Sequence, residues 1–521
     1  MLEQEFVSVA EMIELNARAR PNEPALIDST GEISWRSLDC LVTASANAWI
    51  AQGLGRAQPV AMLIDSSRWS WIHLFGVLRA GGVAAPLNTM LGPDAIHAQL
   101  ADARATHLLV SRTYSDLAAA VIPRIGFEEP CRVVCSEDGF LSGTVDISAA
   151  AAVASVDRPT VILRPDDPAT IIYSSGTTGT PKGIVHSHRA RAQMALILAS
   201  VFRCSTSCRL LLTTPPHTNG SFMVLLPTLA TGGAVYLAGS FNPQRYLEEI
   251  RRFRPTLAFM VPTMAQALID LPAAQETDWS CFDFIVTAGA PMSSELKRRT
   301  REMTGERLGE LWGFTEGVAT AIQPHQMKDH PDSVGRAIPT CEIRVVDECG
   351  NELPKGEIGE LVGRCAIAMT GYLARPASNE AIAWKSPDGH VFMRTGDLGS
   401  VDADGWVTIK GRSKDMLISG GLNIYPADIE AVGLEHPAVQ DCSVVGVSHP
   451  KWGETPVAFV KLKPSGEVGA DELKAWINER VGRHQRVHDV VLVGEFPRNT
   501  LGKVVKGELA EVYARRCRLD T

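Results

Sequence analysis

Residues 173–183 form a segment rich in glycine, serine and threonine that could hold a phosphate group. They read YSSGTTGTPKG and follow an apolar run at 169–172. Glycines let the backbone curl so that successive N–H groups face an anion, while hydroxyls add donors and the lysine adds a charge. The donor candidates are Ser174, Ser175, Gly176, Thr177, Thr178, Gly179 and Lys182. The segment is not a Walker P-loop, because its glycine and lysine spacing differs and Pro181 precedes the lysine.

Four further side chains have types that suit nucleotide chemistry, although each has an ordinary structural explanation when taken alone. Glu316 could supply an oxygen ligand to Mg²⁺, and Asp397 could accept hydrogen bonds from two vicinal hydroxyls. A lone histidine after a strand, such as His217, is usually structural. A lysine such as Lys503 is usually solvated and replaceable. Only the residues that flank these four side chains favour a functional role over an ordinary turn, cap or surface position.

At least five motifs, in order along the chain, resemble those of the adenylate-forming superfamily. This superfamily includes acyl-CoA synthetases, firefly-type luciferases and the adenylation domains of nonribosomal peptide synthetases. After the segment at 173–183, the motifs are IVTAGAPM at 285–292, LWGFTE at 311–316, RTGDL at 394–398, KGRSKDMLISGGLN at 410–423 and PRNTLGK at 497–503. The resemblance covers about residues 8–512 and implies adenylate formation from ATP.

The resemblance assigns roles to residues in these motifs. Lys503, His217, Thr178 and Glu316 would be catalytic, with Glu316 also the Mg²⁺ ligand and Asp397 the ribose ligand. Trp312 stands where tyrosine is more usual, so it keeps an aromatic face but puts any hydrogen bond through a phenol hydroxyl in question. Beyond the segment at 173–183, the implied ATP and CoA contacts are Gly289, Ala290, Pro291, Trp312, Gly313, Thr315, Asp397, Arg412, Gly420 and Gly421.

The resemblance also divides the chain into two domains. Residues 1–414 would form the domain that holds ATP and the acyl group, and residues 415–521 a small domain that carries Lys503. Asp415 would be the hinge about which the small domain turns. Arg412 would contact the nucleotide, and the loop with Gly420 and Gly421 would line the entry path of pantetheine.

The elements that must position these residues alternate between strand and helix. Apolar runs at 60–64, 83–86 and 107–111 are separated by helix-like patterns at 69–80 and 95–101. Such alternation is typical of an α/β protein with parallel strands. The resemblance adds a small distorted β-barrel before the hinge. Beyond it, helices near 427–434 and 471–481 and strands at 443–447 and 457–462 predict a compact α+β unit.

Length and composition exclude several classes of protein. A chain of 521 residues is too long for one ordinary hydrophobic core, so at least two domains are expected. The formal charge of −9 does not favour binding to nucleic acid. The eleven cysteines are scattered without zinc-site spacing, which favours a reducing cytoplasm. The N-terminus lacks a secretory pattern and no run reaches the roughly 20 apolar residues of a membrane span. The sequence leaves the oligomeric state open, a homodimer included.

The predicted activity is that of an AMP-forming carboxylate:CoA ligase using ATP, Mg²⁺ and CoA. No Asp or Glu occurs from Thr213 to Ala230, where the amino-acid-activating branch of the superfamily carries an aspartate. This favours a fatty, aromatic or alicyclic acid over an amino acid, since a buried ammonium would need a partner. Free CoA is favoured as acceptor because no carrier domain follows Lys503. The alternatives are a stand-alone enzyme that loads a carrier protein, a luciferase-like oxygenase, and a non-catalytic nucleotide-binding relative.

Overall fold

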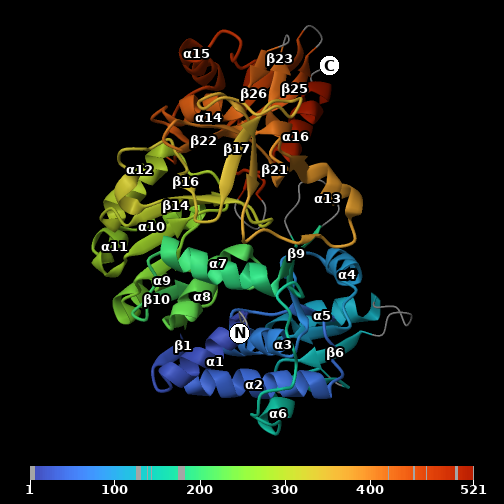
Figure 1. The fold of residues 1–521 in the computed structure, drawn as a ribbon. Helices are drawn as coiled ribbons and strands as arrows, with labels where there is room; N and C mark the ends of the chain where they lie inside the picture. Colours follow the sequence, from blue (N-terminus) through green and yellow to red (C-terminus); the bar gives the residue numbers. More distant parts are fainter. Residues whose placement is uncertain are drawn as a thin grey trace.

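The chain forms four β-sheets with helices packed around them (Figure 1). The computed structural model describes residues 6–124, 131–137, 139–141, 143–173, 182–419, 422–449, 452–464, 466–498 and 503–519. Two large sheets and their helices make up the N-terminal part, a third sheet follows them, and the fourth sheet lies at the far end with the C-terminal helices.

The first large sheet has nine strands, most of them parallel. Its order is β16 (Arg336–Ala337), β15 (Ala319–Ile322), β14 (Leu308–Gly313), β13 (Phe284–Thr287), β12 (Leu257–Phe259), β10 (Arg209–Leu212), β11 (Ala234–Leu237), β1 (Pro24–Asp28) and β2 (Gly31–Ser34). Pairing is parallel from β14 to β1 and antiparallel at both ends. The carboxyl ends of its parallel strands therefore share one edge.

The second large sheet has eight strands and contains the hairpin that flanks the glycine-rich segment. Its order is β19 (Gly371–Tyr372), β9 (Gly183–Ser187), β8 (Pro168–Tyr173), β4 (Val83–Pro86), β3 (Pro59–Leu63), β5 (His107–Val110), β6 (Arg132–Cys135) and β7 (Val145–Asp146). Strands β8 and β9 are antiparallel with Tyr173 opposite Gly183. Residues 174–181 between them lie outside the described residues.

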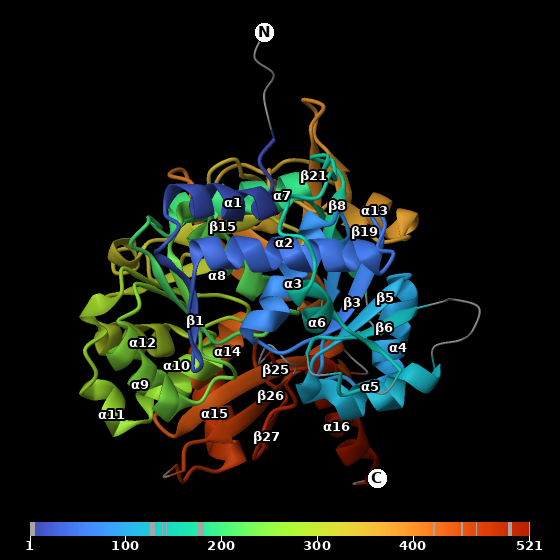
Figure 2. The same ribbon diagram turned by 90° about the horizontal axis from the view of Figure 1, so that it is seen from below.

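Helices cover both faces of both large sheets. One core joins the two sheets through α1 (Val9–Ala19), α2 (Trp35–Ala51), α3 (Arg68–Arg79), α7 (His188–Val201) and α8 (Asn219–Thr231). The outer face of the first sheet carries α9 (Pro243–Phe253), α10 (Pro262–Ile269), α11 (Pro272–Gln275) and α12 (Ser294–Thr304). The outer face of the second carries α4 (Pro93–Asp102) and α5 (Ser115–Val121), while α6 (Ile147–Ala152) packs on α2. Figure 2 shows α1 and α2 crossing the molecule on the side away from the C-terminal sheet.

These helices begin where the sequence supplies a cap. Ser34, Ser67 and Ser187 each accept a hydrogen bond from a backbone N–H of the first turn of the helix that follows. With Ser34 as its cap, α2 begins at Trp35, whose side chain is fully buried. The predicted α/β class with parallel sheets is confirmed.

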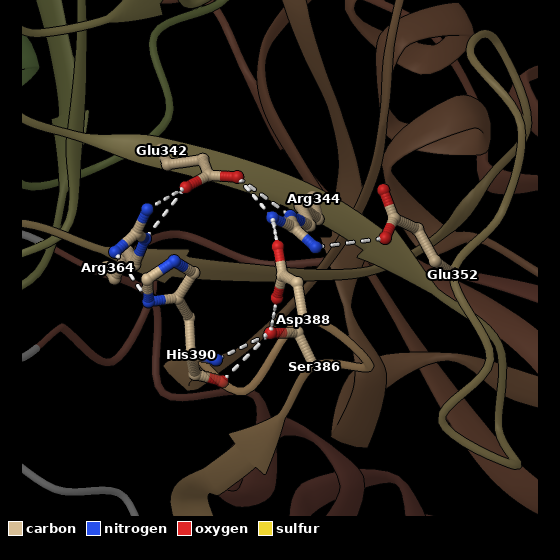
Figure 3. A network of polar contacts seen from close by, with 7 residues as sticks. All are labelled: Glu342, Arg344, Glu352, Arg364, Ser386, Asp388 and His390. Atoms are coloured by element: carbon tan, nitrogen blue, oxygen red, sulfur yellow. Dashed lines mark hydrogen bonds and ion pairs between the residues drawn. The ribbon is translucent and has the colours of Figure 1, made fainter.

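The third sheet is antiparallel and is held at one end by a polar network (Figure 3). Its strands are β17 (Glu342–Val346), β18 (Gly359–Arg364), β20 (Ala383–Lys385), β21 (Val391–Val401) and β22 (Val407–Arg412), with α13 (Pro376–Ile382) before β20. Arg344 Nη2 donates to Asp388 Oδ2 over 2.7 Å, and Arg364 Nε donates to Glu342 Oε2 over 2.7 Å. The network thus joins β17, β18 and the β20–β21 turn.

The fourth sheet is joined to the third by only a few residues. It contains β23 (Leu417–Ser419), β24 (Leu422–Ile424), β25 (Val439–His449), β26 (Gly453–Leu462) and β27 (Asp489–Leu492), with α14 (Pro426–Leu434), α15 (Ala470–Arg480) and α16 (Lys506–Leu519) around it. Strand β22 ends at Arg412 in the third sheet and β23 begins at Leu417 in the fourth. A single 3₁₀ turn, Ser413–Asp415, occupies most of the connection.

Two further properties of the described part of the chain bear on function. No helix in it is both long and apolar enough to cross a membrane. The ten cysteines whose side chains are described form no disulfide with one another.

We expect Arg344→Met to lower the thermal unfolding midpoint by about 2–4 °C, because Arg344 bonds Glu342, Glu352 and Asp388 at once. Hydrogen bonds from Ser386 and then Arg344 hold the pKa of Asp388 below its usual value. The contribution of the ionised Asp388 to folding stability is present above the ordinary carboxyl pKa of about 4 and is lost as pH falls. The difference between variant and wild type should therefore shrink below about pH 4 in calorimetric scans.

Arg298→Met is the matched control, since Arg298 also pairs with two carboxylates, but on the exposed face of α12. Exposed pairs of this kind contribute little to stability. An Arg298→Met effect as large as that of Arg344→Met would contradict the structural role of the network.

Candidate functional site

The predicted site residues lie where several parallel strands end. The turn with Gly289, Ala290 and Pro291 follows β13, the segment through Thr315 and Glu316 follows β14, and His217 lies between β10 and α8. The glycine-rich segment follows β8 in the second sheet. Because β10, β13 and β14 run parallel in one sheet, the three segments that follow these strands share its carboxyl edge.

Asp397 is the centre of the best-defined group of contacts. It lies on β21 directly opposite Arg412 on β22, and only 6% of it is exposed. Arg412 Nε lies 2.8 Å from Asp397 Oδ1, and the indole Nε1 of Trp312 donates to Asp397 Oδ2 over 2.8 Å. The structure therefore brings together three predicted residues from two sheets. The indole N–H of Trp312 therefore supplies a hydrogen bond to Asp397.

The Asp397 carboxylate keeps acceptor capacity for a ligand. Its Oδ1 is buried and, within the part of the chain that the structure describes, receives no well-directed hydrogen bond despite the nearby guanidinium. A carboxylate with one oxygen oriented by an indole and the other facing a cation is suited to accept hydrogen bonds from hydroxyl groups.

Lys503 lies in the same electrostatic environment as Asp397. Burial lowers the pKa of its ammonium group, and the neighbouring positive charge of Arg412 lowers it further. The carboxylates of Asp397 and Asp415 act in the opposite direction. The C-terminal part of the chain therefore places its predicted lysine beside residues of the third sheet.

Glu316 and Lys182 are linked by an aromatic residue that the motifs do not indicate. Tyr372 donates its hydroxyl to Glu316 Oε1 over 2.8 Å, and Lys182 Nζ lies 5.0 Å from the centre of the Tyr372 ring. Burial, and then the charge of Glu316, raises the pKa of Tyr372, so its hydroxyl stays protonated. Tyr372 thus holds the carboxylate and the end of the glycine-rich segment in one place.

A second residue outside the predicted set fixes the loop that carries Thr315 and Glu316. His186 on β9 is fully buried and bonds the Thr315 carbonyl through Nε2 at 2.8 Å. Burial lowers the pKa of His186 well below the usual value, so the ring is neutral. The loop then turns at Gly317, where φ is +105° and a Cβ would lie 2.5 Å from the Ile367 carbonyl oxygen. Only glycine fits this turn.

His217 is buried and uncharged at neutral pH. Its exposed fraction is 8%, and burial lowers its pKa to about 4. Its Nδ1 atom has no hydrogen-bond partner among the described residues. A neutral imidazole with an unused nitrogen can contact an incoming anion without an ion pair of its own to break.

The other predicted residues are placed as follows. Gly289 adopts a φ of +91°, and Gly313 ends β14. Asp415 closes the 3₁₀ turn between the third and fourth sheets. Ser174, Ser175, Gly176, Thr177, Thr178, Gly179, Gly420 and Gly421 lie outside the described residues.

Sequence reasoning missed Tyr372 and His186. His186 lies beside the glycine-rich segment, but its partner Thr315 is 129 positions away along the chain. The short strand β19 that carries Tyr372 pairs with β9, far from it in sequence. No local pattern reports such pairings, so a single sequence contains no signal for either contact.

Family models match most of the chain. The model for AMP-binding enzymes matches residues 13–373, and the model for the C-terminal domain of AMP-binding enzymes matches residues 428–503. The chain is 31% identical over 521 residues to an indoleacetate–CoA ligase of Aromatoleum aromaticum, covering 98% of this chain and 99% of the relative. It is 31% identical over 497 residues to a feruloyl-CoA synthase of an Amycolatopsis species, covering 95% and 96%.

Solved structures give the same result and indicate a conformational state. ATP-bound MatB from Rhodopseudomonas palustris is 29% identical, with a TM-score of 0.86 over 96% of this chain and 99% of that one. The apo form of the same protein covers the same shares but has a TM-score of 0.77. The backbone of this chain is therefore more similar overall to the ATP-bound form than to the apo form.

We expect the imidazole of His217 to remain uncharged from pH 8 down to about pH 5, since its pKa lies near 4. Histidine carbon–proton NMR spectra recorded across this range measure its charge directly. His217→Gln identifies the signal by its loss. A His217 signal that titrates near pH 6.5 would show that the site is open to water and would contradict this description.

Proposed function

The chain belongs to the family of AMP-binding, adenylate-forming enzymes, and from this premise we propose how its residues act. The activity is that of an AMP-forming carboxylate:CoA ligase. Its substrates are a small carboxylic acid, ATP and CoA, and Mg²⁺ accompanies ATP. The roles of individual residues below are proposals.

The single observation that best supports the proposal is the group formed by Trp312, Asp397 and Arg412 with Lys503 beside it. Asp397 would bind the ribose hydroxyls through its available oxygen. Arg412 would then lie near the nucleotide, and the Lys503 ammonium would face the reacting phosphate and carboxylate. Gly289, Ala290, Pro291, Gly313 and Thr315 would line the adenine and phosphate positions.

In the first step two anions must react. A carboxylate oxygen attacks the α-phosphorus of ATP, the bond to the β-phosphate oxygen breaks, and pyrophosphate leaves with the electron pair. Cationic groups and N–H donors already in place favour this transition state, because water would have to reorganise to do the same. Lys503 and Lys182 would supply the charge, and His217 would contact the acid without competing for a proton.

Glu316 fits a role as a magnesium ligand. Mg²⁺ in nucleotide sites is usually held by one or two carboxylates together with phosphate oxygens and water. Tyr372 fixes one oxygen of Glu316 and leaves the other without a donor in the described part of the chain. No group of three or more candidate ligand side chains occurs among the described residues, which suits a metal held mainly by its substrate. The ion would offset phosphate charge.

In the second step the CoA thiolate attacks the acyl carbonyl and AMP leaves. Lys503 must withdraw for this, so we propose that residues 415–521 rotate relative to residues 1–414 about Asp415. The short connection between β22 and β23 supports such a motion, because few contacts would have to break there. The segment with Gly420 and Gly421 would then face the thiol.

The acyl group is a carboxylate without an α-amino group. This proposal rests on the stretch Thr213–Ala230, which runs through His217 and most of α8 and has no acidic residue. Relatives named for indoleacetate and ferulate support aromatic acids, and a relative named for long-chain fatty acids supports aliphatic ones. We propose a cytoplasmic location, which the free thiols support.

The proposed activity is tested by pyrophosphate release from MgATP with a panel of fatty, aromatic, alicyclic and amino acids, with and without CoA. We expect release to depend on a carboxylic acid lacking an α-amino group, to accelerate with CoA, and to yield AMP and an acyl-CoA. Transfer to a carrier protein but not to CoA would identify a carrier-loading enzyme instead, and light emission would identify an oxygenase.

Lys503→Ala should slow adenylation by about 100–1,000-fold, because it removes one charge placed for the transition state. Conversion of a synthetic acyl adenylate to acyl-CoA should change little. The ammonium is active only when protonated, and its pKa is lowered from 10.5. As pH rises, wild-type adenylation should therefore begin to decline before pH 10.5 is reached. Both half-reactions can be followed separately by quenched-flow assays.

Lys506→Ala is the matched control. Lys506 lies three residues beyond Lys503 but bonds Glu430 of α14 over 2.7 Å. Its loss should lower stability without a specific defect in adenylation. Equal defects in both variants would assign Lys503 a structural role.

A further inference from the structure

Arg191 is a buried cation that has no carboxylate partner among the residues that the structure describes. It lies in the first turn of α7, only 1% of it is exposed, and no acidic residue occurs from 188 to 231. Burial alone lowers its pKa to about 9, so it remains charged at neutral pH. An unpaired buried charge is costly, and proteins rarely keep one without a compensating anion.

The guanidinium is held rigidly, and part of it is unused. Its Nε donates to Thr170 Oγ1 over 2.8 Å and its Nη1 donates to Asn219 Oδ1 over 2.7 Å. Its plane lies against Phe222, with Cζ 4.6 Å from the ring centre. The Nη2 atom is buried and has no hydrogen-bond partner in the described part of the chain.

Arg191 determines how Asn219 is oriented. A guanidinium can only donate, so the Asn219 side chain must turn its oxygen toward Arg191 and its two N–H donors away from it. Asn219 is half-buried, whereas Arg191 is fully buried. The pair therefore presents N–H groups backed by a positive charge.

Asn219 also lies at the start of α8, and no side chain caps the N-terminus of this helix. Asn219 is the first residue of this helix, and Thr218 before it donates its hydroxyl to the Pro215 carbonyl instead of accepting from the first turn. The first N–H groups of a helix and its dipole favour an anion. The helix start and the buried guanidinium are independent features that favour the same kind of ligand at one position.

We propose that the start of α8 binds a second anionic group of the acyl substrate, with Asn219 as the donor and Arg191 as the residue that orients it. The inference rests on the proposed ligase activity and narrows its substrate to acids with two anionic groups, such as dicarboxylates or sulfonated carboxylates. One carboxylate would react with ATP, and the other group would supply the missing counter-charge of Arg191.

The test compares matched acids that differ only in the second anionic group. Hexanoate with adipate, cyclohexanecarboxylate with trans-cyclohexane-1,4-dicarboxylate, and propanoate with 3-sulfopropanoate form suitable pairs. We expect kcat/KM from CoA-dependent pyrophosphate release to favour the dianionic member of at least one pair by about 100-fold. Calorimetric titration of the same acids into the protein with a non-hydrolysable ATP analogue measures the preference without turnover.

Two variants then locate the preference. Asn219→Asp preserves shape but gives Arg191 an internal carboxylate partner, and Arg191→Met removes the charge. Each should reduce the preference by about 100-fold and leave KM for ATP within about threefold of wild type, while Arg191→Lys should retain part of it. Arg79→Met is the control, since Arg79 is also buried but pairs with Asp39 and donates to Thr43 and the Ala10 carbonyl.

Monoanionic acids that are used and bound as well as dianionic ones in every pair would overturn the inference and leave the ligase activity standing. A raised KM for ATP in Asn219→Asp would also overturn it, because the anion held by α8 would then be the nucleotide. A dianion preference in binding, with no CoA-dependent turnover of any acid, would support the inference and remove the ligase proposal. If the variants fail to fold, the wild-type comparison alone decides.

Discussion

The contact between Asp397 and its two partners is the interaction on which the rest of the site depends. Trp312 belongs to the first large sheet, Asp397 and Arg412 to the third, and Lys503 follows the fourth. One buried carboxylate therefore links the first and third sheets at the point where the chemistry is proposed. The indole N–H of Trp312 orients one oxygen of this carboxylate.

The sequence predicted the α/β class and the motifs because those features are local. Strand-like runs, glycine turns and the residues beside them can be recognised within a few positions. The links between motifs could not be predicted in this way. The pairing of β19 with β9 places Tyr372 against Glu316 and Lys182. The packing of α7 on α8 places Arg191 against Asn219. Both depend on register between segments far apart in the chain.

The site combines positive or neutral groups with few acids of its own. Lys182, Arg191, Arg412 and Lys503 carry charge, while His186 and His217 are kept neutral by burial. Reactants that are all anions would compensate these charges, so substrate binding should relieve electrostatic strain within the protein. Arg191, which has no acidic partner among the described residues, should reduce the stability of the free enzyme, a common cost of a preorganised site.

The ends of the large sheets have a consequence for the behaviour of the protein in concentrated solution. The first sheet ends in β16 and β2 and the second in β19 and β7; β2 has four residues and the other three strands have two each. A long bare edge strand would offer a row of backbone groups to a neighbouring molecule and promote aggregation. Because Tyr372 lies on β19, the residue that positions Glu316 also helps to close a sheet edge, and loss of that short strand would expose β9 to intermolecular pairing.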